Sequence, residues 1–355
     1  MIYKDAVIFC EEFAKTTRPR FAFGVTPYSK DIAKKFAITG FIDEFTDATS
    51  VDGLPVVTWS EVPADAMVVS GIADCHPLTA QRVMKDQHCD CLDFFSFYRY
   101  FTTFLNPVAF YHGQAFVDDY RQNKSRYENV RHQLADALSA ETFDKIINFR
   151  LTNRLAALEG FTCRTNEQYF DLPFVKDYAR HFVDCGGFDG ATSLEFARLF
   201  PDYKSIQVFE PDISQCQLIA QTLNALPGVR VYPYGVSDQS ETLRFSRAGS
   251  ASKICDSGDV TIEVVTLDGL LKGDVSCLKM DIEGYELPAL AGAQNIIKTQ
   301  KPLLAICCYH KPDDLWTIPQ RVLSYNPDYK IYLRHYSEGL LETVFYFVPE
   351  SLTDE

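Results

Sequence analysis

Short apolar stretches bounded by turn residues recur along the 355-residue chain and alternate with stretches of helical spacing. Near the start they predict strands at residues 20–23, 39–42, 53–57 and 66–70. Further on they predict strands at residues 182–183, 205–209, 229–232, 277–280 and 303–308. Helices are predicted at residues 5–15, 29–36, 191–200, 213–226 and 315–323. Strands that alternate with helices are typical of parallel sheets, so the chain is predicted to be an α/β protein.

Between residues 89 and 177 the sequence pattern becomes that of helices. The aromatic stretch 94–101 is expected to be interdomain core, although such a cluster can also line a sugar or lipid pocket. Apolar positions at helical spacing predict two helices within 119–153, with a break at the capping-type sequence 139–141. We therefore expect a degenerate Rossmann-like domain at 1–88, a helical connecting region at 89–177 and a second α/β domain at 178–355.

The first loop of the N-terminal domain, residues 24–29, keeps one glycine where a dinucleotide loop has three. Pro27 removes an N–H group and Tyr28 adds bulk where a pyrophosphate needs open backbone. Asp43 stands where a ribose-binding acid would be. A structural, dimerising or substrate-presenting role is favoured, and retained nucleotide binding is the minor alternative.

The composition limits the classes of binding partner and the cellular location to be expected. The 48 acidic residues outnumber 34 basic ones, and a net charge of −14 argues against a nucleic-acid partner. No apolar run is long enough to span a membrane, and the start has no signal-peptide core, which predicts a cytoplasmic protein. The 11 cysteines show no C-x-x-C spacing, so we expect reduced thiols and no zinc site.

A glycine-rich turn at residues 184–190, D-C-G-G-F-D-G, follows a predicted strand and precedes a predicted helix. Its glycines are spaced differently from the G-x-G-x-x-G of dinucleotide loops. Asp184 would repel a pyrophosphate but attract the ammonium and sulfonium charges of S-adenosylmethionine. Glu210 ends the next strand, about twenty residues on, where a carboxylate commonly holds ribose hydroxyls. The sequence therefore predicts an S-adenosylmethionine site.

Other polar residues follow later strands. Asp281 comes directly after the strand 277–280, and His310 follows the strand 303–308. Because ligands of open α/β sheets lie beyond the carboxyl ends of strands, Asp184, Glu210 and Asp281 are expected to converge on one crevice. A β-rich insertion is predicted at 242–245 and 261–265, after a turn at 235–238, and the chain closes with a predicted hairpin at 330–334 and 343–348 around a turn at Gly339.

Between about residues 168 and 348 the chain resembles the FkbM-type S-adenosylmethionine-dependent methyltransferases. The resemblance is carried by Q-Y-F at 168–170, F-V-D-C-G-G-F-D-G at 182–190, F-E-P-D at 209–212, G-V-S-D at 235–238, T-L-D at 266–268, L-K-M-D-I-E-G-Y-E at 278–286 and Y-H-K-P at 309–312. It implies a Rossmann-like class I methyltransferase sheet with an antiparallel last strand, and O-methylation of a hydroxyl, commonly on a sugar or polyketide. In the cofactor site it implies Asp184, Gly186, Gly187 and Gly190 at the methionine end, Glu210 at the ribose, Ser237 and Asp238 near the adenine, and Asp281 facing the methyl group.

His310 is the first candidate for a general base, because imidazole titrates near neutrality; the alternative is a structural histidine bonded within its turn. Asp281 and Glu283 lie two residues apart and are expected to pair with His310 as base or as metal ligands. Magnesium would suit such ligands, but no metal is indicated. Glu283 and Glu286 could instead favour the N-terminus of the following helix.

The first hypothesis is an O-methyltransferase that acts on a small-molecule or glycan acceptor, whose pocket we expect the helices around residues 94–120 to build. The alternatives are a non-catalytic scaffold that keeps the fold and, with less support, an NAD-dependent oxidoreductase. The sequence does not identify the acceptor. It does not determine the oligomeric state either, and a homo-oligomer is one option.

Overall fold

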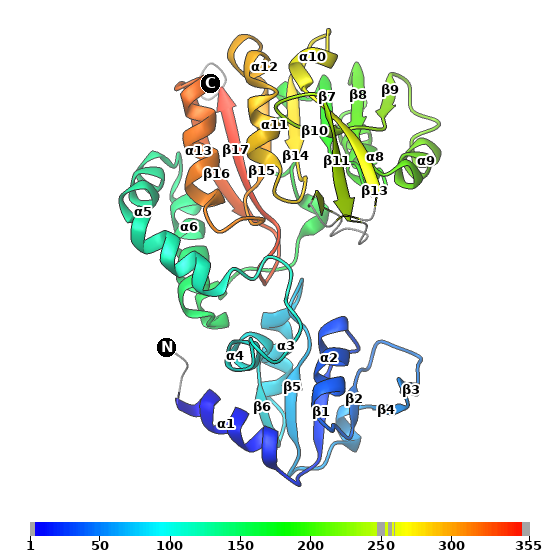
Figure 1. Cartoon of the computed structure of the whole chain (residues 1–355), viewed down its shortest axis with the longest axis vertical. Helices are drawn as coiled ribbons and strands as arrows, with labels where there is room; N and C mark the ends of the chain where they lie inside the picture. The colour runs from blue at the N-terminus through cyan, green and yellow to red at the C-terminus, as the bar shows by residue number, and fades with distance from the viewer. Residues whose placement is uncertain (1–3, 247–252, 255–257, 259, 350–355) are drawn as a thin grey trace. The chain divides into compact units, whose positions relative to one another are not determined.

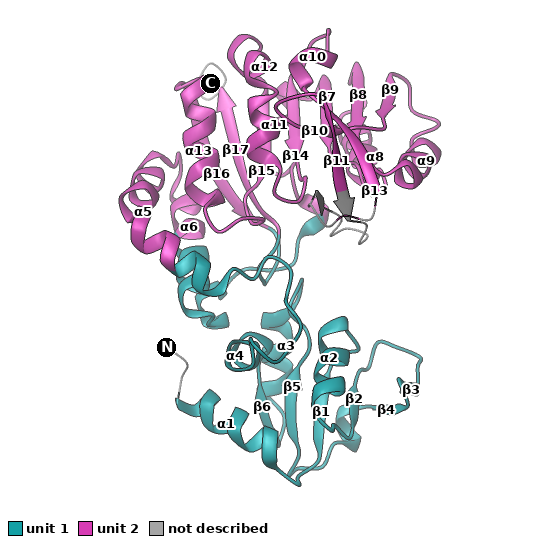
Figure 2. Cartoon of the chain, viewed as in Figure 1, with its two compact units in different colours: residues 1–117, 144–165, 336–341 teal, residues 118–143, 166–335, 342–355 magenta. Residues whose placement is uncertain are grey.

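The computed structural model describes residues 4–246, 253–254, 258 and 260–349, and its chain divides into two compact units (Figures 1 and 2). Unit 1 consists of residues 1–117, 144–165 and 336–341, and unit 2 of residues 118–143, 166–335 and 342–355. The expected connecting region 89–177 is therefore divided between the two units. Neither unit is a continuous stretch of sequence.

Unit 1 is built on a six-stranded sheet in the order β3-β4-β2-β1-β5-β6. All of its neighbouring strands are parallel except β3 and β4. The strands are β1 (Arg20–Phe23), β2 (Gly40–Ile42), β3 (Ser50–Val51), β4 (Leu54–Val57), β5 (Met67–Ser70) and β6 (Asp90–Leu92). The helices are α1 (Lys4–Lys15), α2 (Pro27–Lys35), α3 (Pro77–Lys85) and α4 (Phe94–Tyr100). The four strands predicted for this region are thus present.

The aromatic stretch 94–101 packs inside unit 1. Four of its side chains, Phe94, Phe95, Phe97 and Tyr98, are buried. The ring of Phe97 lies 5.2 Å from that of Phe13 on α1, edge to face. This geometry is typical of aromatic pairs in a core, so the stretch contributes packing to unit 1.

In the loop 24–29 of unit 1, backbone N–H groups are bonded by side chains of the unit itself. The Thr26 hydroxyl accepts the Ser29 N–H at 3.1 Å and donates to the Gly71 carbonyl at 2.7 Å, and the Val25 N–H donates to Asp43 at 2.9 Å. These are the N–H groups that a phosphate at the start of α2 would use. The geometry favours the structural role expected for this unit.

A short segment from the end of the chain also belongs to unit 1. Residues 336–341 connect the last two strands of the protein, and Glu338 within them is buried. Its carboxylate accepts the Thr79 N–H at 2.7 Å, in the first turn of α3. A negative charge at a helix N-terminus is stabilising.

Unit 2 is built on a seven-stranded sheet in the order β16-β17-β15-β14-β7-β8-β9. Only β17 runs against its neighbours, β15 and β16. The strands are β7 (His181–Cys185), β8 (Ser205–Phe209), β9 (Val229–Tyr232), β14 (Cys277–Met280), β15 (Leu303–Cys307), β16 (Tyr329–His335) and β17 (Thr343–Pro349). The predicted sheet with an antiparallel last strand is confirmed. Strand order reverses between β7 and β14, which is where ligands of open α/β sheets bind.

A smaller sheet in the order β10-β13-β11-β12 forms the predicted insertion. Its strands are β10 (Gly235–Val236), β11 (Glu241–Ser246), β12 (Lys253–Ile254) and β13 (Val260–Val265). The start of the predicted turn 235–238 is therefore a strand, because Gly235 and Val236 pair with Val264 and Val265. The helices of this half are α7 (Val175–Tyr178), α8 (Ala191–Leu199), α9 (Ile213–Thr222), α10 (Leu267–Leu270), α11 (Glu286–Ala291), α12 (Gln294–Thr299) and α13 (Asp314–Tyr325).

Helices α5 (Gly113–Gln133) and α6 (Ala137–Thr152) confirm the two predicted helices, but the predicted break at 139–141 is wrong. The break lies at residues 134–136, because the Asp136 carboxylate accepts the Ser139 N–H at 2.7 Å and caps α6 three residues before the predicted cap Ser139. Among the described residues, no cysteine forms a disulfide and no helix is long and apolar enough to cross a membrane.

Candidate active site

The glycine turn at the end of β7 owes its composition to close packing. Gly186 has φ +87°, and a Cβ there would lie 2.0 Å from the carbonyl oxygen of Asp281. A Cβ on Gly187 would lie 2.3 Å from a methyl group of Val208. Gly190, with φ +84°, precedes α8. The ends of β7, β8 and β14 can approach this closely only because side chains are absent there.

Asp184 lies beneath this turn and is completely buried. Its carboxylate is 3.0 Å from the ammonium of Lys279 on β14, and it accepts the Ser193 hydroxyl at 2.8 Å. The sequence predicts that Asp184 meets the positive charges of the cofactor. In the structure the positive charge beside Asp184 is that of Lys279. The Asp184 carboxylate has no exposed surface from which to meet a ligand.

Glu210 reaches the glycine turn from the end of β8. Its carboxylate accepts the N–H of Phe188, within the turn, at 3.1 Å and the N–H of Asp212 at 2.9 Å. Burial raises the pKa of Glu210. The apolar side chain of Phe188, whose N–H bonds this carboxylate, is 40% exposed, and that of Ile213, three residues after Glu210, is 62% exposed. Glu210 is thus close to the turn, as the sequence predicts.

Ser237 and Asp238 follow β10. Ser237 is buried, its N–H donates to the Val265 carbonyl at 2.9 Å, and its hydroxyl donates to the exposed Asp238 at 3.1 Å. A Cβ on Gly235 would lie 3.9 Å from Pro211, the residue after Glu210. This segment therefore lies beside the turn that carries Glu210.

Asp281, at the end of β14, is held from several directions. It accepts the Tyr169 hydroxyl at 2.8 Å and the Tyr309 hydroxyl at 3.3 Å, and it lies 3.4 Å from Nε2 of His310. Burial alone would raise the pKa of Asp281, but Lys279, His310 and the tyrosine hydroxyl hold it below its usual value. Asp281 is therefore a fixed, ionised carboxylate.

His310, at the end of β15, lies behind the carboxylates. Its side chain is 0% exposed, and its Nδ1 lies 2.8 Å from Glu286. Its Nε2 lies 3.4 Å from Asp281 and 3.6 Å from Glu283. Burial lowers the pKa of His310, but attraction to Glu286, Asp281 and Glu283 outweighs it and raises the pKa to about 10. The imidazole is therefore protonated at neutral pH and donates to Glu286.

Glu283 faces the same imidazole and keeps 19% of its side chain exposed. Its φ of +58° is unusual for a residue with a side chain. Burial raises its pKa to about 8; Asp281 and Glu286 add to the rise, and His310 opposes it. Glu283 thus changes charge close to neutral pH.

Glu286 begins α11 and combines two roles. Its carboxylate accepts the Ile282 N–H at 3.0 Å, in the loop before the helix, as well as bonding His310. The helix-terminus alternative considered from the sequence therefore describes Glu286 better than Glu283. No group of three or more His, Cys, Asp or Glu side chains within the described ranges is arranged to hold a metal ion.

Neither Lys279 nor Tyr169 is among the site residues predicted from the sequence. A signal for Lys279 was present, since a lysine inside the apolar stretch C-L-K-M predicts a buried partner. Tyr169 lies more than a hundred residues before Asp281, and its φ of +74° turns the chain there. Only the folded chain brings these side chains together.

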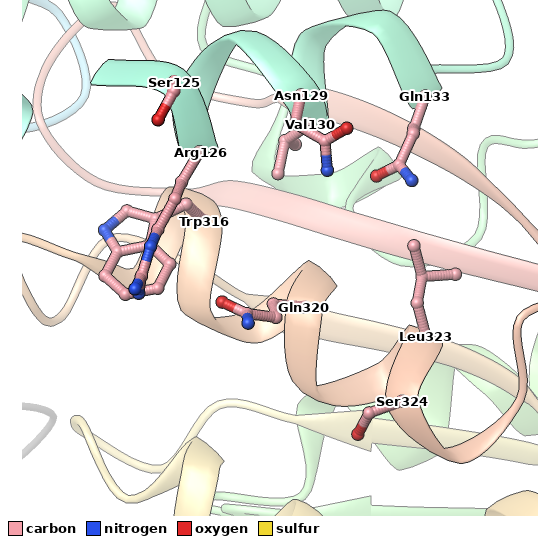
Figure 3. Close-up of a pocket in the computed structure, with 9 residues that line it drawn as sticks. All are labelled: Ser125, Arg126, Asn129, Val130, Gln133, Trp316, Gln320, Leu323 and Ser324. Atoms are coloured by element: carbon pink, nitrogen blue, oxygen red, sulfur yellow. The ribbon is translucent and has the colours of Figure 1, made fainter. Parts of the chain in front are cut away.

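A separate hollow of about 400 Å³ lies between α5 and α13 (Figure 3). Figure 3 shows Arg126 lying over the ring of Trp316, with 4.3 Å between the guanidinium carbon and the ring centroid. The indole N–H of Trp316 donates to Asp119 at 3.0 Å. None of the predicted site residues lines this hollow.

The fold is of the class I methyltransferase type. It has a seven-stranded sheet with one reversed strand, and a carboxylate, that of Glu210, bonds the glycine turn at the point where strand order reverses. Residues 184–333 match the family model described as the methyltransferase FkbM domain, so this part of the chain is an FkbM methyltransferase domain. Its methyl donor is S-adenosylmethionine. This identification supports the methyltransferase hypothesis over the oxidoreductase alternative.

Solved methyltransferase structures resemble this chain to different extents. The methyltransferase FkbM from Methylobacillus flagellatus KT is 22% identical, and the match covers 98% of this chain and 94% of that chain with a TM-score of 0.77. An rRNA methylase from Streptococcus thermophilus is 12% identical, with coverage of 49% of this chain and 92% of that chain and a TM-score of 0.33. No curated protein sequence matches the chain significantly.

Proposed function

We propose that this protein transfers the methyl group of S-adenosylmethionine to a hydroxyl group of a sugar or glycosylated metabolite, and that Glu283 accepts the hydroxyl proton. One observation carries the proposal. Of the three candidate bases after β14 and β15, the side chain of His310 is fully buried and the pKa of Asp281 is held below its usual value, whereas Glu283 is partly exposed and its pKa is raised to about 8. A general base must reach the proton that it removes.

The residues around the glycine turn fit the donor. Glu210 would hold the ribose hydroxyls, since its carboxylate already lies against the turn at the strand-order reversal. Gly186, Gly187 and Gly190 would line the methionine end, with Ser237 and Asp238 near the adenine. Asp281, fixed and ionised, would lie near the transferred methyl group. The donor supplies an electrophilic methyl group on a positively charged sulfur.

Glu283 and His310 then have different roles in the transfer. The Glu283 carboxylate would accept the proton of the acceptor hydroxyl as that oxygen takes the methyl group, and the donor would leave as a neutral thioether. His310 keeps its own proton, and its positive charge orients Asp281 and Glu283. Positioning supplies much of the rate in such an in-line displacement. A base with a pKa of about 8 is well matched to neutral pH.

A carbohydrate acceptor suits the groups available. The carboxylates of Glu283 and Asp281 and the hydroxyl of Tyr309 are hydrogen-bonding groups for neutral hydroxyls. The same carboxylates, within a chain of net charge −14, disfavour phosphate-rich acceptors. The resemblance to FkbM-type methyltransferases, which implies O-methylation commonly on a sugar or polyketide, is compatible with this acceptor class.

The test is methyl transfer from labelled S-adenosylmethionine to a panel of glycosides, with wild type and Glu283→Gln. The variant should bind the donor normally but transfer about 10²- to 10⁴-fold more slowly, as expected for loss of a general base. The wild-type rate should rise with pH until about 8. Glu263→Gln, an exposed glutamate on β13, is the matched control and should be unaffected.

Full activity in the Glu283→Gln variant would reject Glu283 as the base. Failure of every variant and of wild type to methylate any glycoside, despite donor binding, would reject the acceptor class. A scaffold without turnover predicts that second result with amine and phenol acceptors as well.

A further inference from the structure

Lys279 is a charged residue in a strand whose four side chains are all buried. Only 2% of its surface is exposed. Burial lowers the pKa of Lys279, but Asp184 and Asp281 outweigh this and hold it above its usual value. The ammonium is therefore charged at every physiological pH.

An ion pair between Lys279 and Asp184 is a poor explanation by itself. Buried ion pairs replaced by apolar residues of similar size often leave stability unchanged or improved. The fold of β14 would be served equally well if both charges were replaced together, for example by a methionine at 279 and an uncharged residue at 184. A charge kept here calls for a further task.

The ammonium of Lys279 makes contacts that lead directly to the glycine turn. It donates to the Gly186 carbonyl at 2.8 Å, on the residue that packs against Asp281. It also lies 5.4 Å from the centre of the Tyr169 ring, and the hydroxyl of that ring holds Asp281. One side chain thus links the turn to the carboxylate beyond β14.

We propose that Lys279 is a positioning residue for the methyl donor, because its ammonium fixes the Gly186 carbonyl and the turn around it. Asp184 then serves by holding Lys279 in place and makes no contact with the donor. The inference rests on the proposed placement of the donor at the glycine turn.

The experiment compares Asp184→Asn, Lys279→Met and the double variant with wild type. Calorimetric titration measures the affinity for S-adenosylmethionine and for S-adenosylhomocysteine, and thermal unfolding measures Tm. The matched control is the pair Lys301→Met and Asp328→Asn, an exposed ion pair of the same unit with 3.7 Å between its charged atoms. The control should change neither quantity.

Lys279→Met should lower Tm, since it leaves Asp184 buried without its partner, and should weaken both ligands about tenfold or more. The double variant should regain Tm because neither charge remains, yet bind as weakly as Lys279→Met. Asp184→Asn keeps the Lys279 ammonium that donates to the Gly186 carbonyl. This variant should bind both ligands within about threefold of the wild-type affinity. If Lys279→Met does not fold, the double variant and Asp184→Asn carry the comparison.

A double variant that recovers affinity together with Tm would show that the pair is only structural and overturn the proposal. Weak binding by Asp184→Asn at normal Tm would also overturn it, in favour of direct contact between Asp184 and the donor. A folded wild type that binds neither ligand would reject the donor site itself, an outcome distinct from both.

Discussion

Three glycines with nearly the same backbone conformation allow the packing of the turn to be measured. Gly186, Gly190 and Gly53 have φ of +87°, +84° and +81°. A Cβ on Gly186 would lie 2.0 Å from a backbone oxygen of Asp281, one on Gly190 would be in ordinary contact at 3.4 Å with Ile219, and one on Gly53 would meet nothing within 4 Å. Substitution by alanine therefore separates conformational cost from steric overlap.

Gly53→Ala should destabilise unit 1 by about 1 kcal/mol, the cost of a side chain in the left-handed region, partly offset by lower entropy of the unfolded chain. Gly190→Ala should cost a similar amount in unit 2. Gly186→Ala bears the same cost and forces the ends of β7 and β14 apart by about 1 Å or more. Overpacking of that kind adds about 1–3 kcal/mol or more, here at its upper end because the opposing atom is backbone.

The assay is equilibrium unfolding in urea followed by tryptophan fluorescence. The chain has two tryptophans, and Trp59 lies in unit 1 whereas Trp316 lies in unit 2. Trp59→Phe and Trp316→Phe backgrounds assign each transition to its unit. Gly186→Ala should lower the unfolding free energy of unit 2 by about 3 kcal/mol more than Gly190→Ala does. Equal losses for the two variants would refute the steric argument.

Three further results are expected. Glu210→Ala should weaken binding of S-adenosylmethionine about tenfold in calorimetric titration, and unchanged affinity would remove Glu210 from the site. Glu283→Gln should flatten the pH dependence of stability. The folded-state pKa of Glu283, about 8, exceeds its ordinary 4.5, so the folded protein keeps the proton and wild-type stability falls as pH rises between these values; parallel wild-type and variant curves from urea unfolding would contradict this. Titration with NAD should give no heat of binding, because Thr26 and Asp43 already occupy the N–H groups at the start of α2; micromolar binding would show that unit 1 retains a nucleotide site.

The sequence predicted the seven strands of the unit 2 sheet and four of the six strands of the unit 1 sheet, because buried parallel strands are continuous apolar runs bounded by turn residues. It missed the short β3 and also β6, which lies inside the region 89–177 that was predicted to be helical. It also placed Glu210 and Asp281 correctly at strand ends. It did not predict the partner of Asp184, since Lys279 is remote in sequence and its pairing depends on strand order. The burial of His310 was hidden for the same reason: three carboxylates from the segment 281–286 surround it only after β14 and β15 pair.

The helix break shows a different limit. Both Asp136 and Ser139 are good capping residues, and local sequence does not decide between them. The choice follows from a tertiary contact, since the Ala135 N–H donates to the Ile331 carbonyl on β16 at 2.8 Å. Propensity locates such a boundary to within a few residues, and packing fixes it.

The divided path of the chain constrains how this protein can be recombined during evolution. Unit 1 is encoded in three separate stretches, and the last of them, residues 336–341, carries the buried Glu338 that bonds the first turn of α3. A single genetic crossover near residue 117 would exchange α3 without its acidic partner. Descendants that replace one unit by another must therefore exchange three segments together, which favours inheritance of the two units as a pair.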